Sequence, residues 1–321
     1  MLIDIAYLAV GGALLYFGAE WLIKGAAGLA RERGVRPLLV GLTVVAYGTS
    51  SPELVVSTVA ALQGKSAISL GNVIGSNIAN LALILGATAA ISPLAVESRL
   101  VRRELPVMVA TALLLPILLL NQKLGRLDAA LLLVSAALFT WMASRPGLPA
   151  QIEEAEMMEH DAEEAGAPRV RGRGSLAVLA LAGLLVLLCG GRVFVQGASA
   201  LALALGMSER MVGLTIVAVG TSLPELAACL VAALRGHASI AVGNIVGSNI
   251  FNVLFVLGAT AAISPVSVSL RAAAVDLAVM IVLSGVAFFM LWSHRRVSRT
   301  EGIVLMCSYV AFLTYLLIDA L

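Results

Sequence analysis

Apolar runs long enough to cross a lipid bilayer recur along almost the whole chain, and most polar positions fall between them. A bilayer core about 30 Å thick needs about 20 residues of helix. This pattern predicts an all-α integral membrane fold with ten transmembrane helices. The predicted spans cover approximately 4-30, 37-62, 67-92, 104-120, 126-144, 175-204, 210-234, 239-264, 272-292 and 302-319.

One strongly polar segment, 145-174, separates the first five spans from the last five. It is rich in glutamate and closes with three arginines. Runs of like charge usually form solvated linkers, although so acidic a stretch is also compatible with a regulatory cation site. The chain therefore divides into an N-terminal five-helix unit at 1-144, an acidic linker at 145-174 and a C-terminal five-helix unit at 175-321.

Composition excludes two broad classes of protein. The 321 residues are 60% hydrophobic and 12% charged, with a mean hydropathy of +1.00. Soluble domains contain about 25% charged residues, so an ordinary soluble domain is excluded. The formal net charge of +2 provides no basic surface for nucleic acid. The lipid bilayer is thus a predicted partner, whereas the sequence predicts no particular protein partner.

Lysine and arginine are unevenly distributed between the two predicted sides of the membrane. With the N-terminus outside, the cytoplasmic loops hold 14 of the 21 basic residues and the outer loops hold 5. Cytoplasmic loops are generally enriched in these residues. We therefore predict a multi-pass protein of the plasma (inner) membrane, with both termini outside and the 145-174 linker in the cytoplasm.

The strongest sequence signal is an internal repeat. Residues 41-93 align with residues 213-265 at a constant offset of 172 without a gap, and 33 of the 53 positions are identical. Because five predicted spans separate the copies, the second copy enters the membrane from the opposite side. Inverted repeats are typical of secondary transporters, whose substrate sites lie near the membrane midplane. The pattern predicts two inverted five-helix repeats that work by alternating access.

Polar residues interrupt the second predicted span, and the same residues recur in the seventh. Pro52 removes a backbone donor and displaces the carbonyl of Gly48, which we expect to become available as a ligand. Thr49 and Glu53 are four residues apart and share a helical face. Oxygen ligands of this kind suit calcium and sodium. The duplicated residues are Thr49, Ser50, Pro52 and Glu53 in the first copy and Thr221, Ser222, Pro224 and Glu225 in the second.

Polar stripes also mark the third and eighth predicted spans. Their members are Asn72, Ser76 and Asn80 in one copy and Asn244, Ser248 and Asn252 in the other. Singly, such residues often only pack helices or satisfy their own backbone. A glutamate at membrane depth costs a few kcal/mol and is functional by default, which singles out Glu53 and Glu225. Glu20 and Lys24 are four residues apart and are interpreted as a structural pair.

The duplicated GTS-x-PE and GSNI-x-N segments resemble the two alpha repeats of the sodium/calcium exchanger family, within the cation/calcium antiporters. The resemblance covers all ten spans and implies that Glu53 and Glu225 bind calcium. It implies a supporting set of ligands from side chains and from two backbone carbonyls, with no cofactor besides the transported Ca²⁺ and Na⁺. That set comprises Thr49, Thr221, Ser50, Ser222, Ser76, Ser248 and Asn80, with Asn252 and the carbonyls near Ala46 and Ala218.

The sequence leaves the counter-ion open. Some members of the family carry Asp at the position of Asn252, so the number of sodium positions and a potassium requirement are not fixed. A proton/calcium antiporter is the first alternative to Ca²⁺/Na⁺ exchange, because the same carboxylates could discharge by protonation. A cation channel is the alternative from another class. An intramembrane hydrolase with Ser50 or Ser222 as nucleophile is disfavoured, because no histidine lies in the motifs to act as a base.

Overall fold

The computed structural model describes residues 2–144, 173–207 and 218–319, and nearly all of these residues are helical. In the first half, the second, third and fourth predicted spans are each divided into several helical pieces. The elements are α1 (Leu2–Arg33), α2 (Pro37–Val40), η1 (Gly41–Val45), α3 (Ala46–Thr49), α4 (Ser51–Leu62), α5 (Ser66–Ile78), η2 (Ala79–Ile84), α6 (Leu85–Ile91), β1 (Leu94–Ala95), η3 (Leu100–Glu104), α7 (Leu105–Leu118), η4 (Leu119–Asn121), β2 (Lys123–Leu124) and α8 (Arg126–Ser144).

The second half repeats this layout. Its described elements are α10 (Arg173–Ala204), α12 (Ala218–Gly220), α13 (Leu223–Leu234), α14 (Ala238–Phe251), η6 (Asn252–Leu257), α15 (Gly258–Ile263), β3 (Val266–Ser267), α16 (Ala274–His294), β4 (Arg296–Val297) and α17 (Arg299–Asp319).

The described residues confirm an all-helical membrane fold. Eight of their helices are long and apolar enough to cross a bilayer, and a ninth span results if the bent pair Pro37–Thr49 and Ser51–Leu62 is counted as one. Of the predicted span at 210-234, the part from Leu223 to Leu234 is α13, whereas 210–217 lies outside the described residues. Most of the predicted linker, at 145–172, lies outside them as well.

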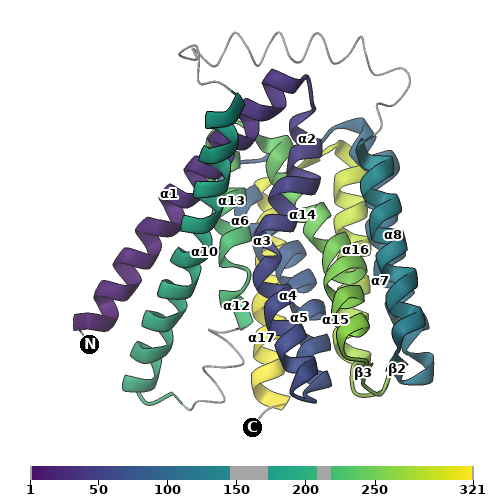
Figure 1. Cartoon of the computed structure of the whole chain (residues 1–321). Coiled ribbons are helices and arrows are strands. Elements are labelled where there is room, and N and C mark those ends of the chain that lie inside the picture. The colour runs from purple at the N-terminus through teal and green to yellow at the C-terminus, as the bar shows by residue number, and fades with distance from the viewer. Residues whose placement is uncertain (1, 145–172, 208–217, 320–321) are drawn as a thin grey trace.

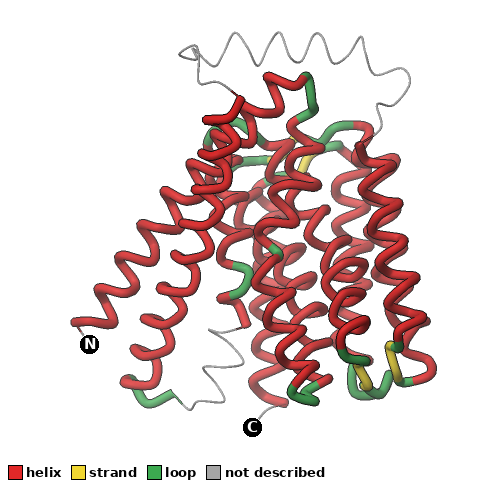
Figure 2. The backbone as a smooth tube through the Cα atoms, viewed as in Figure 1, coloured by secondary structure: helices red, strands yellow, loops and turns green. Residues whose placement is uncertain are grey.

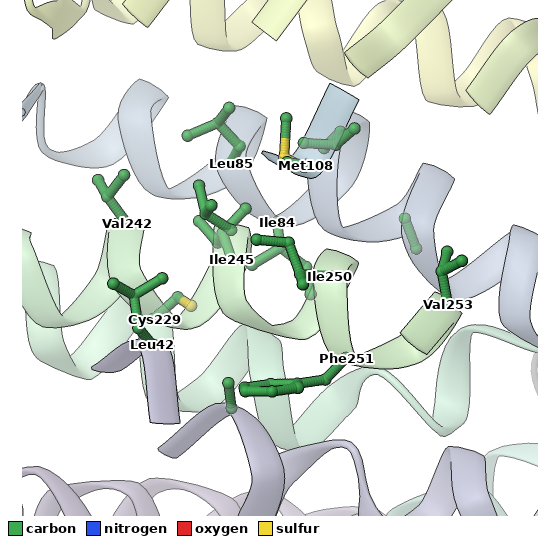
Figure 3. Packing of buried hydrophobic residues seen from close by; sticks show 14 of the residues in the cluster. Leu42, Ile84, Leu85, Met108, Cys229, Val242, Ile245, Ile250, Phe251 and Val253 are labelled. Atoms are coloured by element: carbon green, nitrogen blue, oxygen red, sulfur yellow. The ribbon is translucent and has the colours of Figure 1, made fainter. Parts of the chain in front are cut away.

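The two spans that carry the GSN motif form the centre of the molecule (Figure 1). The buried share of the most apolar stretch is 94% in Ala238–Ile263 and 72% in Ser66–Ile91. The same share is only 17% in Arg299–Ile318. Figure 3 shows Ile245 and Ile250 of α14 beside Ile84 and Leu85. A helix surrounded by protein can carry polar groups that lipid would not tolerate. Because α14 and α5 are buried, they can carry the polar groups of a site in the protein interior.

The α1 and α10 helices form a tightly packed pair at one side of the bundle (Figure 1). Glycines recur every seven residues on both helices, and a Cβ atom at any of them would lie only 2.3–2.7 Å from the opposite helix. Small residues permit such close backbone approach in membranes. The six glycines are Gly11, Gly18 and Gly25 on α1 and Gly183, Gly190 and Gly197 on α10, and the two sets differ by the same offset of 172.

An ionic contact joins this pair to the core. Glu20 Oε1 lies 2.6 Å from Lys24 Nζ, so the predicted pairing is confirmed. The same oxygen lies 2.7 Å from a guanidinium nitrogen of Arg235, just after α13. This hydrogen bond raises the pKa of Arg235 above its ordinary value. Glu20 therefore has a structural role at the junction of α1 and α13.

Two short antiparallel strand pairs connect the halves. β1 pairs with β4, and β2 pairs with β3. Figure 2 shows the two pairs at opposite ends of the bundle. The beginning of α1 and the end of α17 lie at one end, whereas α8 ends and α10 begins at the other (Figure 1). The described termini are therefore on the opposite side from the ends of the linker.

Two arginines after β1 cap the end of α8. A guanidinium nitrogen of Arg99 donates to the carbonyl of Ala143 at 2.9 Å, and one of Arg103 donates to that of Met142 at 3.3 Å. Arg99 Nε also lies 3.5 Å from a carboxylate oxygen of Glu104, which is only 3% exposed. Basic side chains stabilise the last carbonyls of a helix. Arg99 thus joins η3, which ends at Glu104, to α8.

Substitution Arg99→Leu should destabilise the protein by about 2 kcal/mol, because it leaves the buried Glu104 carboxylate without its cation and removes a helix cap. The measurement is the melting temperature of the purified protein in detergent, which should fall. Arg102→Leu is the control, since Arg102 is an exposed neighbour. Equal melting temperatures for the two variants would contradict the structural role of Arg99.

Candidate functional site

The GTS-x-PE segments form a break in each of two helices. α3 ends at Thr49, α4 begins at Ser51, and the two parts are bent by 41°. Pro52 stands in the first turn of α4, where the missing N–H costs nothing. In the second half, α12 ends at Gly220 and α13 begins at Leu223, followed by Pro224. Each proline thus starts a new helix at the interruption.

The carbonyl of Gly48 is used differently from the prediction. Pro52 was expected to leave it available as a ligand, but Ser51 Oγ donates a hydrogen bond to it at 2.7 Å. A carbonyl oxygen has a second lone pair, so one bond does not exhaust it. The second copy has Leu223 in place of Ser51. The two copies therefore differ at this point.

The two glutamates lie in the protein interior and are held by hydroxyl groups. Glu53 is 0% exposed and Glu225 is 1% exposed. Ser76 Oγ donates to Glu53 Oε1 at 3.3 Å, and Ser50 Oγ donates to Glu225 Oε1 at 3.2 Å. Glu225 is thus bonded by a serine of the other copy.

A second contact also crosses between the copies. Thr49 Oγ1 donates to Asn244 Oδ1 at 3.3 Å, and the Nδ2 of Asn244 donates to the sulfur of Cys229 at 3.2 Å. In the first copy, Asn72 Nδ2 makes the equivalent bond to Ser57 at 2.9 Å. Thr49 and Glu53, predicted to share one face of a single helix, instead lie in α3 and α4 on either side of the 41° bend, and Thr49 has a partner from the other half.

Many of the predicted ligands have an oxygen atom without a partner. Ten side-chain atoms of the described residues are buried and accept or donate no hydrogen bond there, and six of them belong to the predicted set. Such atoms are rare in proteins, because each costs about 1–3 kcal/mol. A concentration of them around two carboxylates is typical of a cation site. They are Glu53 Oε2, Glu225 Oε2, Asn80 Oδ1, Asn252 Oδ1, Ser222 Oγ and Ser248 Oγ.

The remaining predicted ligands are less directly placed. Thr221 lies partly buried in the turn between α12 and α13. Ala46 is fully buried, and its carbonyl accepts the backbone N–H of Ser50 at 3.0 Å. Ala218 begins α12, but its side chain lies outside the described part of the structure. The expected participation of the Ala46 and Ala218 carbonyls stays a prediction.

The predicted ligands combine two carboxylates with neutral hydroxyl and amide groups. Across residues 2–144, 173–207 and 218–319, no group of three or more His, Cys, Asp or Glu could hold a metal ion. Structural zinc sites use such groups. Two carboxylates supplemented by hydroxyl and amide oxygens instead suit hard cations such as Ca²⁺ and Na⁺.

Comparison with known families agrees with this chemistry. The family model described as sodium/calcium exchanger protein matches residues 3–145 and 175–318. This chain belongs to the sodium/calcium exchanger family. The match covers nearly the whole chain on both sides of the acidic segment and is interrupted only there.

The exchanger also resembles individual proteins over nearly its full length. It is 33% identical to the sodium/calcium exchanger MaX1 of Methanosarcina acetivorans over 98% of both chains. It is 35% identical to the inner membrane protein YrbG of Escherichia coli over 98% of this chain and 97% of that protein. A solved structure of the sodium-calcium exchanger NCX_Mj superposes with a TM-score of 0.82, at 28% identity, over 98% of this chain and 99% of that one.

One feature of the exchanger was not predicted from its sequence. The helices that carry the GSN motif widen into π-helical stretches at Ala79–Ile84 and Asn252–Leu257. The two stretches correspond under the offset of 172, to within one residue. Such stretches often occur at functional sites. They begin beside Asn80 and at Asn252, two of the predicted ligands, and no local sequence pattern predicts them.

Proposed function

We propose that this exchanger moves Ca²⁺ in one direction and Na⁺ in the other by alternating access. The observation that carries the proposal is the set of six buried, unpartnered oxygen atoms in the described core, one on each of Glu53 and Glu225 and four on other predicted ligands. The proposed Ca²⁺ ligands are the two glutamates with Thr49 and Thr221. The proposed Na⁺ ligands are Ser50, Ser222, Ser76, Ser248, Asn80 and Asn252, with the carbonyls near Ala46 and Ala218.

The charge of this site explains why transport should be exchange. Two ionised carboxylates in a medium of low dielectric repel each other and are costly to bury without a counter-charge. One Ca²⁺ neutralises both, and more than one Na⁺ can do the same. Without a bound cation, the change between the inward and outward states is unfavourable. The protein therefore changes between the inward and outward states only when the site holds a cation.

We infer an architecture of ten spans arranged as two inverted repeats, at 1-144 and 175-321. Three kinds of feature, each with members related by an offset of 172 or 173, support it. β1 corresponds to β3 and β2 to β4, so each strand pair joins one copy to the other. The π-helical stretches and the glycines of α1 and α10 correspond in the same way. Equivalent elements at opposite ends of the bundle are expected of an inverted duplication.

We propose that this exchanger lies in the plasma membrane. Both termini are then outside and the acidic linker is in the cytoplasm. Arginine enrichment supports it. In a background lacking the exposed Cys189 and Cys307, Glu156→Cys should resist an impermeant thiol reagent added to intact cells. Lys123→Cys, in a predicted outer loop, should be labelled. The reverse pattern would invert the assignment.

The counter-ion is tested by reconstituting the purified protein into vesicles and measuring uptake of radioactive calcium. Imposed outward gradients of Na⁺, K⁺ or H⁺ are compared at equal membrane potential. Uptake should follow the Na⁺ gradient and accumulate calcium above its external concentration, which a channel cannot do at zero potential. Uptake driven equally well by a proton gradient alone would favour a proton/calcium antiporter, and a requirement for K⁺ would favour a K⁺-dependent exchanger.

A further inference from the structure

The buried asparagines at the centre of the molecule form a chain of hydrogen bonds with a defined direction. Asn77 Nδ2 donates to the backbone carbonyl of Asn249 at 3.3 Å. Asn252 Nδ2 donates to Asn77 Oδ1 at 3.1 Å. Asn77, Asn249 and Asn252 are 2%, 2% and 0% exposed. The chain therefore runs from a fixed backbone acceptor through Asn77 to Asn252.

The backbone carbonyl determines which way both side-chain amides face. A carbonyl only accepts, so Asn77 must present its NH₂ group to Asn249. The oxygen of Asn77 is then the atom that remains for Asn252, and an oxygen requires a donor. Asn252 must consequently present its own NH₂ group to Asn77. Its Oδ1 is left buried and without a hydrogen-bond partner among the described residues.

The orientation matters because an amide can bind a cation only through its oxygen. If the Asn252 amide were rotated by about 180°, it would direct an NH₂ group, with its partial positive charge, toward a bound cation. Rotation would also oppose two oxygen atoms between Asn252 and Asn77. The hydrogen bond to Asn77 thus selects the orientation that serves as a ligand.

We propose that Asn77 is a positioning residue that holds the Asn252 oxygen toward the transported cation without binding the cation itself. The proposal rests on the proposed function of this site. The repeat equivalent of Asn77 is Asn249, whose side chain donates to Ile245 of its own helix at 2.8 Å. The hydrogen bond between Asn77 and Asn252 therefore orients an amide on one side of the site, that of Asn252.

A change at Asn252 supplies a direct test of orientation. A carboxylate has two equivalent oxygens, so Asn252→Asp presents an oxygen whichever way it faces and has no need of Asn77. The experiment compares four full-length proteins, namely the parent, Asn77→Leu, Asn252→Asp and the double variant. The measured quantity is the concentration of Na⁺ or Ca²⁺ that gives half of the thermal stabilisation of the purified protein, since this requires binding alone.

In the parent background, Asn77→Leu should raise the half-stabilising concentration of at least one cation roughly tenfold to a hundredfold. In the Asn252→Asp background, the same change should raise it less than about threefold. Thr111→Val serves as the control for a lost buried hydroxyl, because among the described residues the Thr111 hydroxyl donates within its own helix, to the carbonyl of Met108 at 2.8 Å. It should leave both concentrations unchanged. If Asn77→Leu does not fold, Asn77→Ala takes its place, because it removes the same amide without added bulk.

Three outcomes would overturn the proposal. These are an unchanged concentration in Asn77→Leu, an equal fold-change in the two backgrounds, and a complete loss of stabilisation in Asn252→Asp, which would show that a carboxyl oxygen cannot serve there. Failure of the proposed function would be seen separately, as a parent protein that neither cation stabilises.

Discussion

Glu53→Gln and Glu225→Gln should each reduce sodium-driven calcium transport at least a hundredfold while the protein still folds. Each change leaves a single carboxylate to face a divalent cation. Breaking a buried ionic interaction by removing one partner costs about 3–5 kcal/mol, and 3 kcal/mol already corresponds to more than a hundredfold in affinity. Glutamine retains the size of the side chain and can still accept from Ser76 or Ser50, so packing should be preserved.

The control for these variants is Glu20→Gln. Glu20 is also a carboxylate within a predicted span, but Lys24 and Arg235 neutralise it. Its loss should lower the melting temperature slightly and leave the half-saturating calcium concentration within about threefold of the parent's value. Near-normal transport by Glu53→Gln or by Glu225→Gln would contradict the assignment of that glutamate to the ion site.

Gly18→Val should destabilise the protein by about 3 kcal/mol, because it forces apart the closely packed helices α1 and α10. A Cβ atom at Gly18 would lie 2.4 Å from the backbone nitrogen of Leu187 and 2.9 Å from the carbonyl oxygen of Gly183. Backbone atoms in the middle of a helix cannot rotate away as a side chain can. The melting temperature and the yield of folded protein should both fall clearly.

Gly12→Val is the matched control, because it introduces the same side chain into the same helix. A Cβ atom there would meet no described atom within 4 Å. Any cost that valine brings to a helix is thus present in both variants, and the difference between them measures the contact of α1 with α10. Equal stability of Gly12→Val and Gly18→Val would show that the glycines do not determine this packing.

The central elements could be read from the sequence because their residues are duplicated. The offset of 172 identified Glu53 and Glu225, and their position inside apolar runs indicated burial. The same offset extends to the glycines of α1 and α10, whose spacing of seven residues is visible in the sequence. A search for equivalent small residues outside the aligned segments would have predicted that packing.

Other features required the structure because they depend on how the copies meet. Thr49 and Glu53 were placed on one helical face, yet Thr49 donates to Asn244 and Ser50 to Glu225, both of the other copy. Spacing along one helix contains no information about a partner on another. The role of Asn77 was missed for the same reason, since it depends on a backbone carbonyl of α14.

Coupled flux is the most direct test of exchange by this protein. Vesicles that contain the purified protein are loaded with ²²Na⁺ and given ⁴⁵Ca²⁺ outside, and both isotopes are followed in the same sample. The two fluxes should rise and saturate together, with a constant ratio, and both should be nearly absent from Glu53→Gln vesicles. Calcium entry at an undiminished rate into vesicles without internal sodium or any other counter-cation would contradict the exchange mechanism.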